Sequence, residues 1–310
     1  MTAGWRVIWL VIVAAMAACG QDPAAGPSPT TGTSTPAPGP TSSVAPTSIA
    51  PAEGQATAPA GQGDGEALRY QGAYEPRVVA VHPHDTTSFT QGLEWYDGML
   101  LESTGREGQS SLRLVDPLSG MAQQVLAVDD DLFAEGVTAV ATRAIQLTWQ
   151  DEALLVTDLP ELTATGSTRL DRAYEGEGWG LCYDGTELVM SDGSDRLTFR
   201  HPDTFEASGQ VAVTLDGEPL ERLNELECIG DQVWANVWQT TTIVAIDPET
   251  GVVDATVDAA GLVPDGYAED TAAVLNGIAY ERDTGRFWLT GKLWPVIYEV
   301  DLEPETVAGG

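Results

Sequence analysis

The sequence predicts an all-β fold, a five-bladed β-propeller with four antiparallel strands per blade, on three observations. The composition includes 33 Gly and 9 Trp residues, which suits a turn-rich β protein better than a helical bundle. A unit of two short apolar strands joined by a turn recurs five times. A second turn marker recurs in phase with it, and the period of 42 to 54 residues is typical of a four-stranded propeller blade.

The first two strands are the clearest part of each unit. The innermost strand begins at residues 89–93, 133–137, 176–180, 223–227 and 275–279. The second strand is predicted at residues 99–103, 144–149, 188–191, 233–238 and 287–290. The dipeptides Asp97-Gly98 and Asp184-Gly185 supply tight turns between paired strands, as hairpins require.

The turn markers indicate where the third strand of each unit gives way to the fourth. They begin at Asp116, Asp158, His201, Asp247 and Asp301, in each case with Pro, Asp, Leu or Gly nearby, as turns favour. Residues 77–81 precede the first unit, and we expect them to supply the outer strand of the last blade, which removes an exposed edge. A propeller closed in this way needs no partner, so we expect a monomer.

The first 19 residues read as an export signal. Arg6 precedes an apolar run at residues 7–18, which is too short to span a bilayer. Cys19 follows small residues and resembles the lipobox of bacterial lipoproteins, in which this cysteine is lipidated after cleavage. An ordinary secretory signal is the alternative. Both predict export, and the lipid anchor at Cys19 would hold the protein on the outer face of a bacterial cell membrane.

Residues 20–65 have the composition of a disordered tether. Nine of the 19 prolines lie there, among Ser, Thr, Gly and Ala. No periodic apolar pattern interrupts them, so the segment cannot bury a core. Residues 66–310 remain to form the folded domain.

The charge excludes two kinds of partner. The chain has 47 Asp and Glu against 14 Lys and Arg, a formal charge of −33. A nucleic-acid binder would instead present a basic face to phosphates, and docking on anionic lipid would need basic residues too.

The two cysteines of the domain, Cys182 and Cys228, fall at equivalent positions in the innermost strands of neighbouring blades. Export permits a disulfide between them; the alternative is two small buried side chains.

Several catalytic constellations are missing from the sequence. It has no Gly-x-Ser-x-Gly elbow, no Gly-rich phosphate loop and no Cys-x-x-Cys pair. His82 and His84 lie on one strand face with Asp85 after them, but no third histidine is near, which favours a strand-end turn over a metal site. A mechanism must therefore rest on carboxylates, amides, lysine and tryptophan.

Polar residues at the start of innermost strands are the candidates for a site. Gln91, Glu135 and Asn224 hold corresponding positions, and the innermost strands of a propeller line its central channel. Trp149 and Trp238 each follow 14 residues after Glu135 and Asn224, respectively, so we expect these groups to converge on one pocket. The alternatives are packing within a blade for each Trp and a backbone cap for Glu135.

Here the sequence resembles the glutaminyl cyclases of the plant and bacterial type, which are exported five-bladed propellers. An ordered set of short motifs carries the resemblance: Phe-Thr-Gln-Gly-Leu at 89–93, Phe-Ala-Glu-Gly at 133–136, Gly-Trp-Gly-Leu at 178–181, Leu-Asn-Glu-Leu-Glu at 223–227, Trp-Ala-Asn-Val-Trp at 234–238, Leu-Asn-Gly-Ile at 275–278 and Gly-Lys-Leu-Trp-Pro at 291–295. They span the domain from about residue 79 to about residue 300.

The resemblance implies cyclisation of N-terminal glutamine on peptides or proteins, with release of ammonia. It assigns the catalytic carboxylate to Glu135 and matches Lys292 and Asn224 to polar groups that hold the amide oxygen. Substrate binding would fall to Gln91 and to the apolar walls, which are Phe89, Trp149, Trp179 and Trp238. The reaction requires no cofactor and no catalytic metal; propeller channels can hold a structural calcium ion, but the sequence does not predict one.

Two other functions remain open at this stage. A non-catalytic propeller lipoprotein would bind peptides at the same mouth, although the retained Glu135 disfavours it. A metal-dependent propeller lactonase would use Glu135, Asn224 and Asn276 as ligands, although Lys292 near the mouth would repel a cation.

Overall fold

The computed structural model describes residues 68–305. The predicted signal, its Cys19 and the predicted tether lie outside the described residues. Within residues 68–305 the fold is all-β, and the helical elements are two short 3-10 turns, η1 (Ala164–Gly166) and η2 (Ala260–Leu262). No helix in this part of the chain has the length and apolar character needed to cross a membrane.

The strands follow one another as four-stranded antiparallel units. Three units are separate sheets: β2 (Thr90–Tyr96), β3 (Met99–Thr104), β4 (Ser111–Val115) and β5 (Ala122–Ala127); β6 (Ala134–Val140), β7 (Arg143–Thr148), β8 (Leu154–Asp158) and β9 (Ser167–Leu170); β10 (Leu181–Tyr183), β11 (Leu188–Ser191), β12 (Arg196–Arg200) and β13 (Ala207–Ala212). A small hairpin of β14 (Thr214–Leu215) and β15 (Glu218–Pro219) follows.

The remaining strands form one eight-stranded sheet with two antiparallel halves. One half is β16 (Leu223–Ile229), β17 (Gln232–Val237), β18 (Thr242–Ile246) and β19 (Val253–Asp258); the other is β20 (Leu275–Glu281), β21 (Arg286–Gly291), β22 (Val296–Pro304) and β1 (Gly72–Pro83). The halves meet where β1 pairs with β19 in parallel, with Gly72 opposite Ala255.

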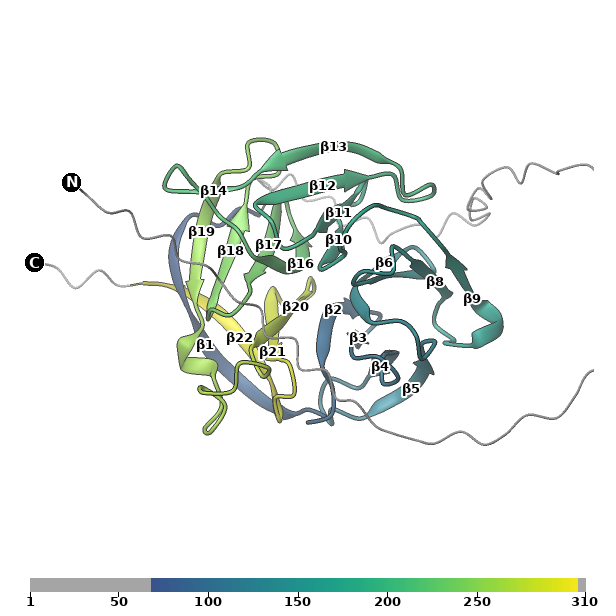
Figure 1. Ribbon diagram of the computed structural model, residues 1–310. Coiled ribbons are helices and arrows are strands. Elements are labelled where there is room, and N and C mark those ends of the chain that lie inside the picture. Colours follow the sequence, from purple (N-terminus) through teal and green to yellow (C-terminus); the bar gives the residue numbers. More distant parts are fainter. Residues whose placement is uncertain (1–67, 306–310) are drawn as a thin grey trace, which may run out of the picture. The chain divides into compact units, whose positions relative to one another are not determined.

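The units are arranged around a common axis, as Figure 1 shows. Their first strands, β2, β6, β10, β16 and β20, pack against one another in a closed ring. Each hydrophobic cluster lies between two neighbouring units; for example, Leu101 and Leu112 of one unit pack on Val137 and Ala144 of the next. Burial of these faces is the main stabilising term, and it leaves one end of the ring free to form a site.

The last unit takes its outer strand from the N-terminal end of the domain, as the sequence predicts. β1 pairs antiparallel with β22, with Arg77 opposite Asp301 and Val81 opposite Tyr298. The expected turn at Asp301-Leu302 is therefore wrong. Both residues lie within β22, because no fourth strand follows in the chain and the third strand can run on beside β1.

The innermost strand of the third unit also differs from expectation. The sequence predicts that it begins at residues 176–180, but β10 starts only at Leu181. The preceding residues bend toward the second unit, where the N–H of Gly178 donates to the carbonyl of Trp149 (2.9 Å) and the N–H of Gly136 donates to the carbonyl of Trp179 (2.7 Å). This bend carries Trp179 to the end of the ring of inner strands.

Cys182 of β10 and Cys228 of β16 are joined by a disulfide across two neighbouring inner strands. The approach of these strands depends on Gly180, because a Cβ there would lie 2.0 Å from the carbonyl oxygen of Asn224. The bridge spans a sequence separation of 46 residues and fastens β10 to β16, the strand that carries Asn224.

Candidate active site

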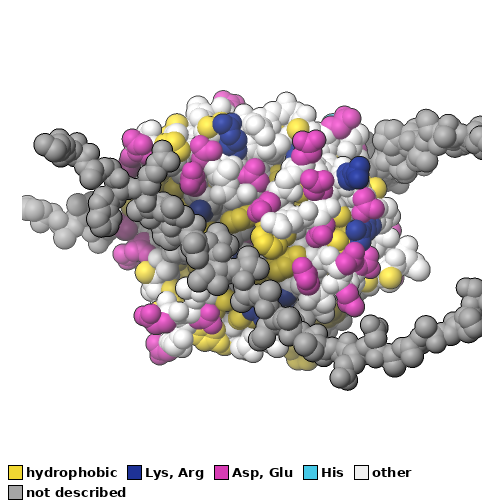
Figure 2. All heavy atoms as spheres, in the orientation of Figure 1, with side chains coloured by type: hydrophobic (Ala, Val, Ile, Leu, Met, Phe, Trp, Pro, Cys, Tyr) yellow, Lys and Arg dark blue, Asp and Glu magenta, His cyan; other side chains and the backbone are white. Residues whose placement is uncertain are grey.

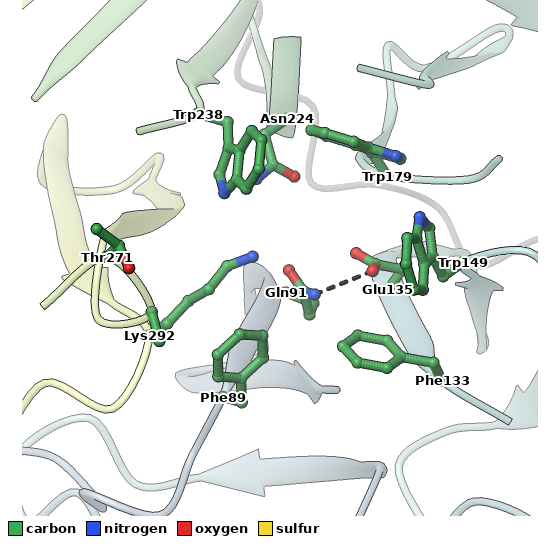
Figure 3. Close-up of a pocket in the computed structure, with 11 residues that line it drawn as sticks. Phe89, Gln91, Phe133, Glu135, Trp149, Trp179, Asn224, Trp238, Thr271 and Lys292 are labelled. Atoms are coloured by element: carbon green, nitrogen blue, oxygen red, sulfur yellow. Dashed lines mark hydrogen bonds between the residues drawn. The ribbon is translucent and has the colours of Figure 1, made fainter. Parts of the chain in front are cut away.

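A cavity of about 370 Å³ opens at one end of the ring of inner strands. Its volume is that of a small-ligand site, which suits one terminal residue of a peptide better than an extended segment. Its lining residues are Phe89, Gln91, Phe133, Glu135, Trp149, Trp179, Asn224, Trp238, Thr271, Ala272 and Lys292 (Figure 3). All the catalytic and substrate-binding residues singled out from the sequence therefore face one cavity.

Bulges in the inner strands aim the polar groups at the cavity. Gln91 lies where the register between β2 and β3 shifts, Glu135 where β6 shifts against β7, and Asn224 where β16 shifts against β17. A bulge bends the strand and turns a side chain away from its regular direction. Asn276 sits at the same kind of shift in β20, but its Nδ2 donates to the carbonyl of Thr90 (3.0 Å) and it does not line the cavity.

A second repeated position supplies both a tryptophan wall and the lysine. The backbone N–H of Trp149 donates to Phe133 O, that of Trp238 to Arg222 O, and that of Lys292 to Val274 O, at 2.8–2.9 Å. In three units these bonds join the residue after the second strand to a residue just before the first strand, at the open end of the hairpin. Lys292 is therefore the counterpart of the two tryptophans, which explains why its side chain points into the same space (Figure 3).

Glu135 is the central acid of the cavity. Its side chain is buried, and its Oε1 accepts a hydrogen bond from Nε2 of Gln91 at 2.9 Å. Burial raises the pKa of Glu135 well above its ordinary value; the charge of Lys292 opposes this shift and that of Glu177 adds to it. A carboxyl group tuned in this direction can exchange a proton near neutral pH.

Lys292 is buried in the same cavity. Burial lowers its pKa to about 8, against the opposing influence of Glu135. Its Nζ lies 4.9 Å from the centre of the Phe89 ring, within the range of a cation–π contact. Figure 3 shows its side chain extending toward Gln91 and Asn224. The cavity thus places a cation, an amide and a carboxyl group around one small volume.

Sequence reasoning missed three lining residues. Phe133 precedes Glu135 by two positions, as Phe89 precedes Gln91, so the repeat itself held a signal for it. Gly105 makes room for the Phe133 ring, because a Cβ at Gly105 would lie 2.4 Å from the ring. Thr271 and Ala272 belong to the loop between β19 and β20, which has no counterpart of similar sequence in the other units.

The histidines do not contribute to the cavity. His84 is buried, and its Nε2 bonds Oε1 of Glu102 at 3.0 Å, while the His82 ring stacks on Trp288. His201 lies in the exposed turn after β12. Within residues 68–305 no group of three His, Cys, Asp or Glu side chains is arranged to hold a metal ion.

Most acidic side chains lie outside the cavity, on the surface. On the face drawn in Figure 2, Asp and Glu side chains are spread around apolar side chains that gather toward the centre. Of this excess, Glu135 is the carboxyl group that lines the cavity.

Comparisons with known proteins agree on one family. The family model described as glutamine cyclotransferase matches residues 48–302. A curated glutaminyl-peptide cyclotransferase of Arabidopsis thaliana is 36% identical over 241 residues, covering 76% of this chain and 74% of that protein. The crystal structure of Myxococcus xanthus glutaminyl cyclase is similar with a TM-score of 0.66 and 38% identity, covering 76% of this chain and 99% of that one.

Proposed function

The chain belongs to the glutamine cyclotransferase family, and from this premise we propose that the cavity around Glu135 is where it acts. Its activity is that of a glutaminyl-peptide cyclotransferase, which converts an N-terminal glutamine to pyroglutamate. The free α-amine attacks the γ-carboxamide carbon of the same residue, a five-membered lactam closes, and the amide nitrogen leaves as ammonia. One C–N bond forms and one breaks, so the reaction needs no oxidant, reductant or covalent enzyme intermediate.

The buried carboxyl group of Glu135 is the observation that carries the assignment. The attacking amine must lose a proton and the departing nitrogen must gain one. A single group with a pKa raised toward neutrality can do both in turn. Gln91 holds one oxygen of Glu135 by the 2.9 Å hydrogen bond, which leaves the other oxygen free for the substrate.

Lys292 and Asn224 act on the opposite side of the reacting carbon. Negative charge develops on the γ-carbonyl oxygen as the amine adds, and a buried ammonium group together with an amide donor stabilises that charge in a site of low polarity. Lys292 supplies the cation and Asn224 the amide, both from buried positions. Glu135 and Lys292 therefore have opposite tasks across the same carbon atom.

The aromatic walls select the reactive conformer. An extended glutaminyl side chain would leave the amine and the carboxamide apart, whereas a cavity of about 370 Å³ favours the folded form. Confinement of two reacting groups contributes to the rate by reducing the entropy lost on ring closure. Phe89, Trp149, Trp179 and Trp238 line the cavity and keep water from the reacting carbon.

The direct test uses the purified protein and a Gln-initiated peptide. The wild type should release ammonia and leave a peptide lighter by one ammonia. Glu135→Gln should lower kcat by about 10²–10⁴-fold with unchanged unfolding temperature, whereas Glu135→Asp should retain part of the rate. A wild type that is inert on several such peptides overturns the activity, and a normal rate for Glu135→Gln overturns the role of Glu135.

The lactonase alternative receives no support from the site. Glu135, Asn224 and Asn276 would have to hold one cation, but Asn276 does not line the cavity and its Nδ2 donates to the carbonyl of Thr90. The ammonium group of Lys292 lines the cavity together with Glu135 and Asn224 and would repel a cation there. Ammonia release that is unaffected by chelator separates the cyclase from the lactonase. Release of ammonia from a Gln-initiated peptide would also rule out the hypothesis of a non-catalytic peptide binder.

The architecture belongs to the same proposal. We infer that the four-stranded units are the blades of a five-bladed β-propeller, supported by the closed ring of inner strands and by the N-terminal strand that completes the last unit. Such a domain needs no second subunit and no cofactor, so we propose a monomer, which sedimentation would test.

We also propose that the protein is exported and anchored to the membrane by a lipid at Cys19. The Cys182–Cys228 disulfide suits an oxidising compartment. Cys19→Ala should move the protein from the membrane fraction to the soluble fraction; a wild type that is already soluble would leave only a cleaved secretory signal.

A further inference from the structure

The aromatic wall of the cavity is built from two stretches of contacting rings. The rings of Phe89 and Phe133 meet edge to face at 6.2 Å between centroids, and Phe133 meets Trp149 at 5.7 Å. On the other side Trp179 meets Trp238 at 5.4 Å. Between Trp149 and Trp179 there is no such ring contact within the described part of the chain, so this wall consists of two separate pieces.

Glu177 joins the two pieces. Its Oε2 accepts hydrogen bonds from Nε1 of Trp149 at 2.8 Å and from Nε1 of Trp179 at 2.9 Å. Its Oε1 accepts a third from Nε2 of Gln150 at 2.8 Å. These donors come from the loop between β7 and β8 and from the bend before β10, so one carboxylate links two units at the mouth of the cavity.

The hydrogen bonds of the link favour the ionised carboxylate of Glu177. Burial would raise the pKa of Glu177, but the hydrogen bonds from Gln150, Trp179 and Trp149 lower it below its ordinary value. Trp149 is 38% exposed, so surrounding side chains alone hold its ring only in part. A hydrogen bond to a charged acceptor is among the stronger local restraints available at such a rim.

We propose that Glu177 is a positioning residue for the cyclisation, fixing the indoles of Trp149 and Trp179 as the two flanks that confine the folded glutaminyl side chain. The inference rests on the proposed function of this cavity. Glu177 does not itself reach the reacting atoms in this role, since both of its oxygens are engaged by the wall. It acts through the two rings.

The negative charge of the Glu177 carboxylate also raises the pKa of Glu135. The groups whose charges act on Glu135 are Lys292, after β21, and Glu177, before β10; the first lowers and the second raises the pKa of Glu135. Removing the charge of Glu177 should therefore lower the pKa of Glu135. The acid limb of the kcat profile, which requires Glu135 unprotonated, should move to lower pH.

The test compares Glu177→Gln with Glu175→Gln. Both replace a carboxylate by its isosteric amide in the same loop, but Glu175 is exposed and no described donor bonds it. For Glu177→Gln we expect KM to rise about tenfold with kcat at its optimum within about threefold of wild type, together with the shift of the acid limb. Glu175→Gln should do neither, and equal behaviour of the two variants overturns the proposal.

A second variant shows whether Glu177 acts through the indoles. Trp149→Phe keeps a ring but removes its N–H, so the effect of Glu177→Gln on KM should be smaller in that background than in the wild type. Effects that simply multiply would contradict the link through Trp149. The indole N–H resonances of Trp149 and Trp179 give a readout without turnover: Glu177→Gln should shift both. An inert wild type with shifted resonances would overturn the proposed function and leave the link intact.

Discussion

Gln91 and Glu135 hold the same bulge position in neighbouring inner strands, and the amide of one donates to the carboxyl group of the other at 2.9 Å. The sequence repeat therefore positions site residues as well as strands. It brings a hydrogen-bond donor and an acid, separated by 44 residues in sequence, to the same depth on adjacent sides of the cavity. Because an amide N–H bonds a charged acceptor more strongly than a neutral one, the bond from Gln91 favours the ionised form of Glu135.

Replacing Gln91 should test this relationship. Gln91→Leu removes a donor that favours the charged carboxylate, so the pKa of Glu135 should rise further and kcat at neutral pH should fall about tenfold. The acid limb of the kcat profile should move to higher pH, opposite to the shift expected for Glu177→Gln. Added to Glu135→Gln, the same change should have almost no further effect; an equal loss in both backgrounds would show that Gln91 acts independently of Glu135.

Lys292 sets the alkaline side of the same profile. Its pKa is lowered to about 8, so the ammonium form predominates below that pH and the neutral amine above it. If the cation stabilises the oxyanion, kcat should fall as pH rises through about 8. Lys292→Met should lower kcat by about 10²–10³-fold and remove this limb, whereas Lys292→Arg should keep activity to higher pH. An alkaline limb that persists in Lys292→Met would assign it to another group.

Much of the fold was predictable because the sequence repeats its own geometry. The boundaries of the second strands fall within one residue of their predicted positions, since each strand is an apolar run between turn residues. The turn predicted at Asp301 is wrong because turn residues are a local signal. Whether the chain turns there depends on whether another strand follows it in the sequence. β1 had already filled that place beside β22.

The site was predictable where residue type and repeat position agreed. Gln91, Glu135 and Asn224 are polar residues at matching places in otherwise apolar strands, so their convergence could be inferred. Glu177 falls within residues 176–180, the predicted start of the third unit, but the sequence does not indicate that its carboxylate binds two indoles. Only the directions of the Trp149 and Trp179 indoles distinguish it from the carboxylate of Glu175.

The disulfide should stabilise the domain without entering the chemistry. It closes a loop with a sequence separation of 46 residues, for which chain-entropy arguments give about 3–4 kcal/mol. Cys182→Ser with Cys228→Ser should therefore lower the unfolding temperature clearly while kcat and KM at 25 °C change little, because neither cysteine lines the cavity. Reductant should lower the unfolding temperature of wild type and leave the double variant unaffected. A large loss of activity in a folded double variant would contradict this separation.

His84 lies in the loop that carries Phe89, and it bonds both Glu102 of β3 and the loop that carries Lys292. Nε2 of His84 bonds Oε1 of Glu102 at 3.0 Å, and its Nδ1 lies 2.9 Å from the carbonyl of Trp294. Burial alone would lower the pKa of His84, but Glu102 raises it above its ordinary value. Burial would raise the pKa of Glu102, and the charge and hydrogen bond of His84 hold it below its ordinary value.

These opposite shifts define a pH window of stability. Because the pKa of His84 is raised, its contribution to stability is complete below the pKa of the unfolded chain, about 6.5, and disappears as pH rises through its pKa in the folded protein. Because the pKa of Glu102 is lowered, its contribution is complete above the pKa of the unfolded chain, about 4.5, and disappears as pH falls through its pKa in the folded protein. The pair should therefore stabilise most between these limits. Urea unfolding of wild type and of His84→Gln at several pH values checks this, because the gap between their free energies of unfolding should narrow on the alkaline side. A gap that stays constant up to pH 9 would mean that His84 is neutral in the folded protein and that packing, not charge, holds the two loops together.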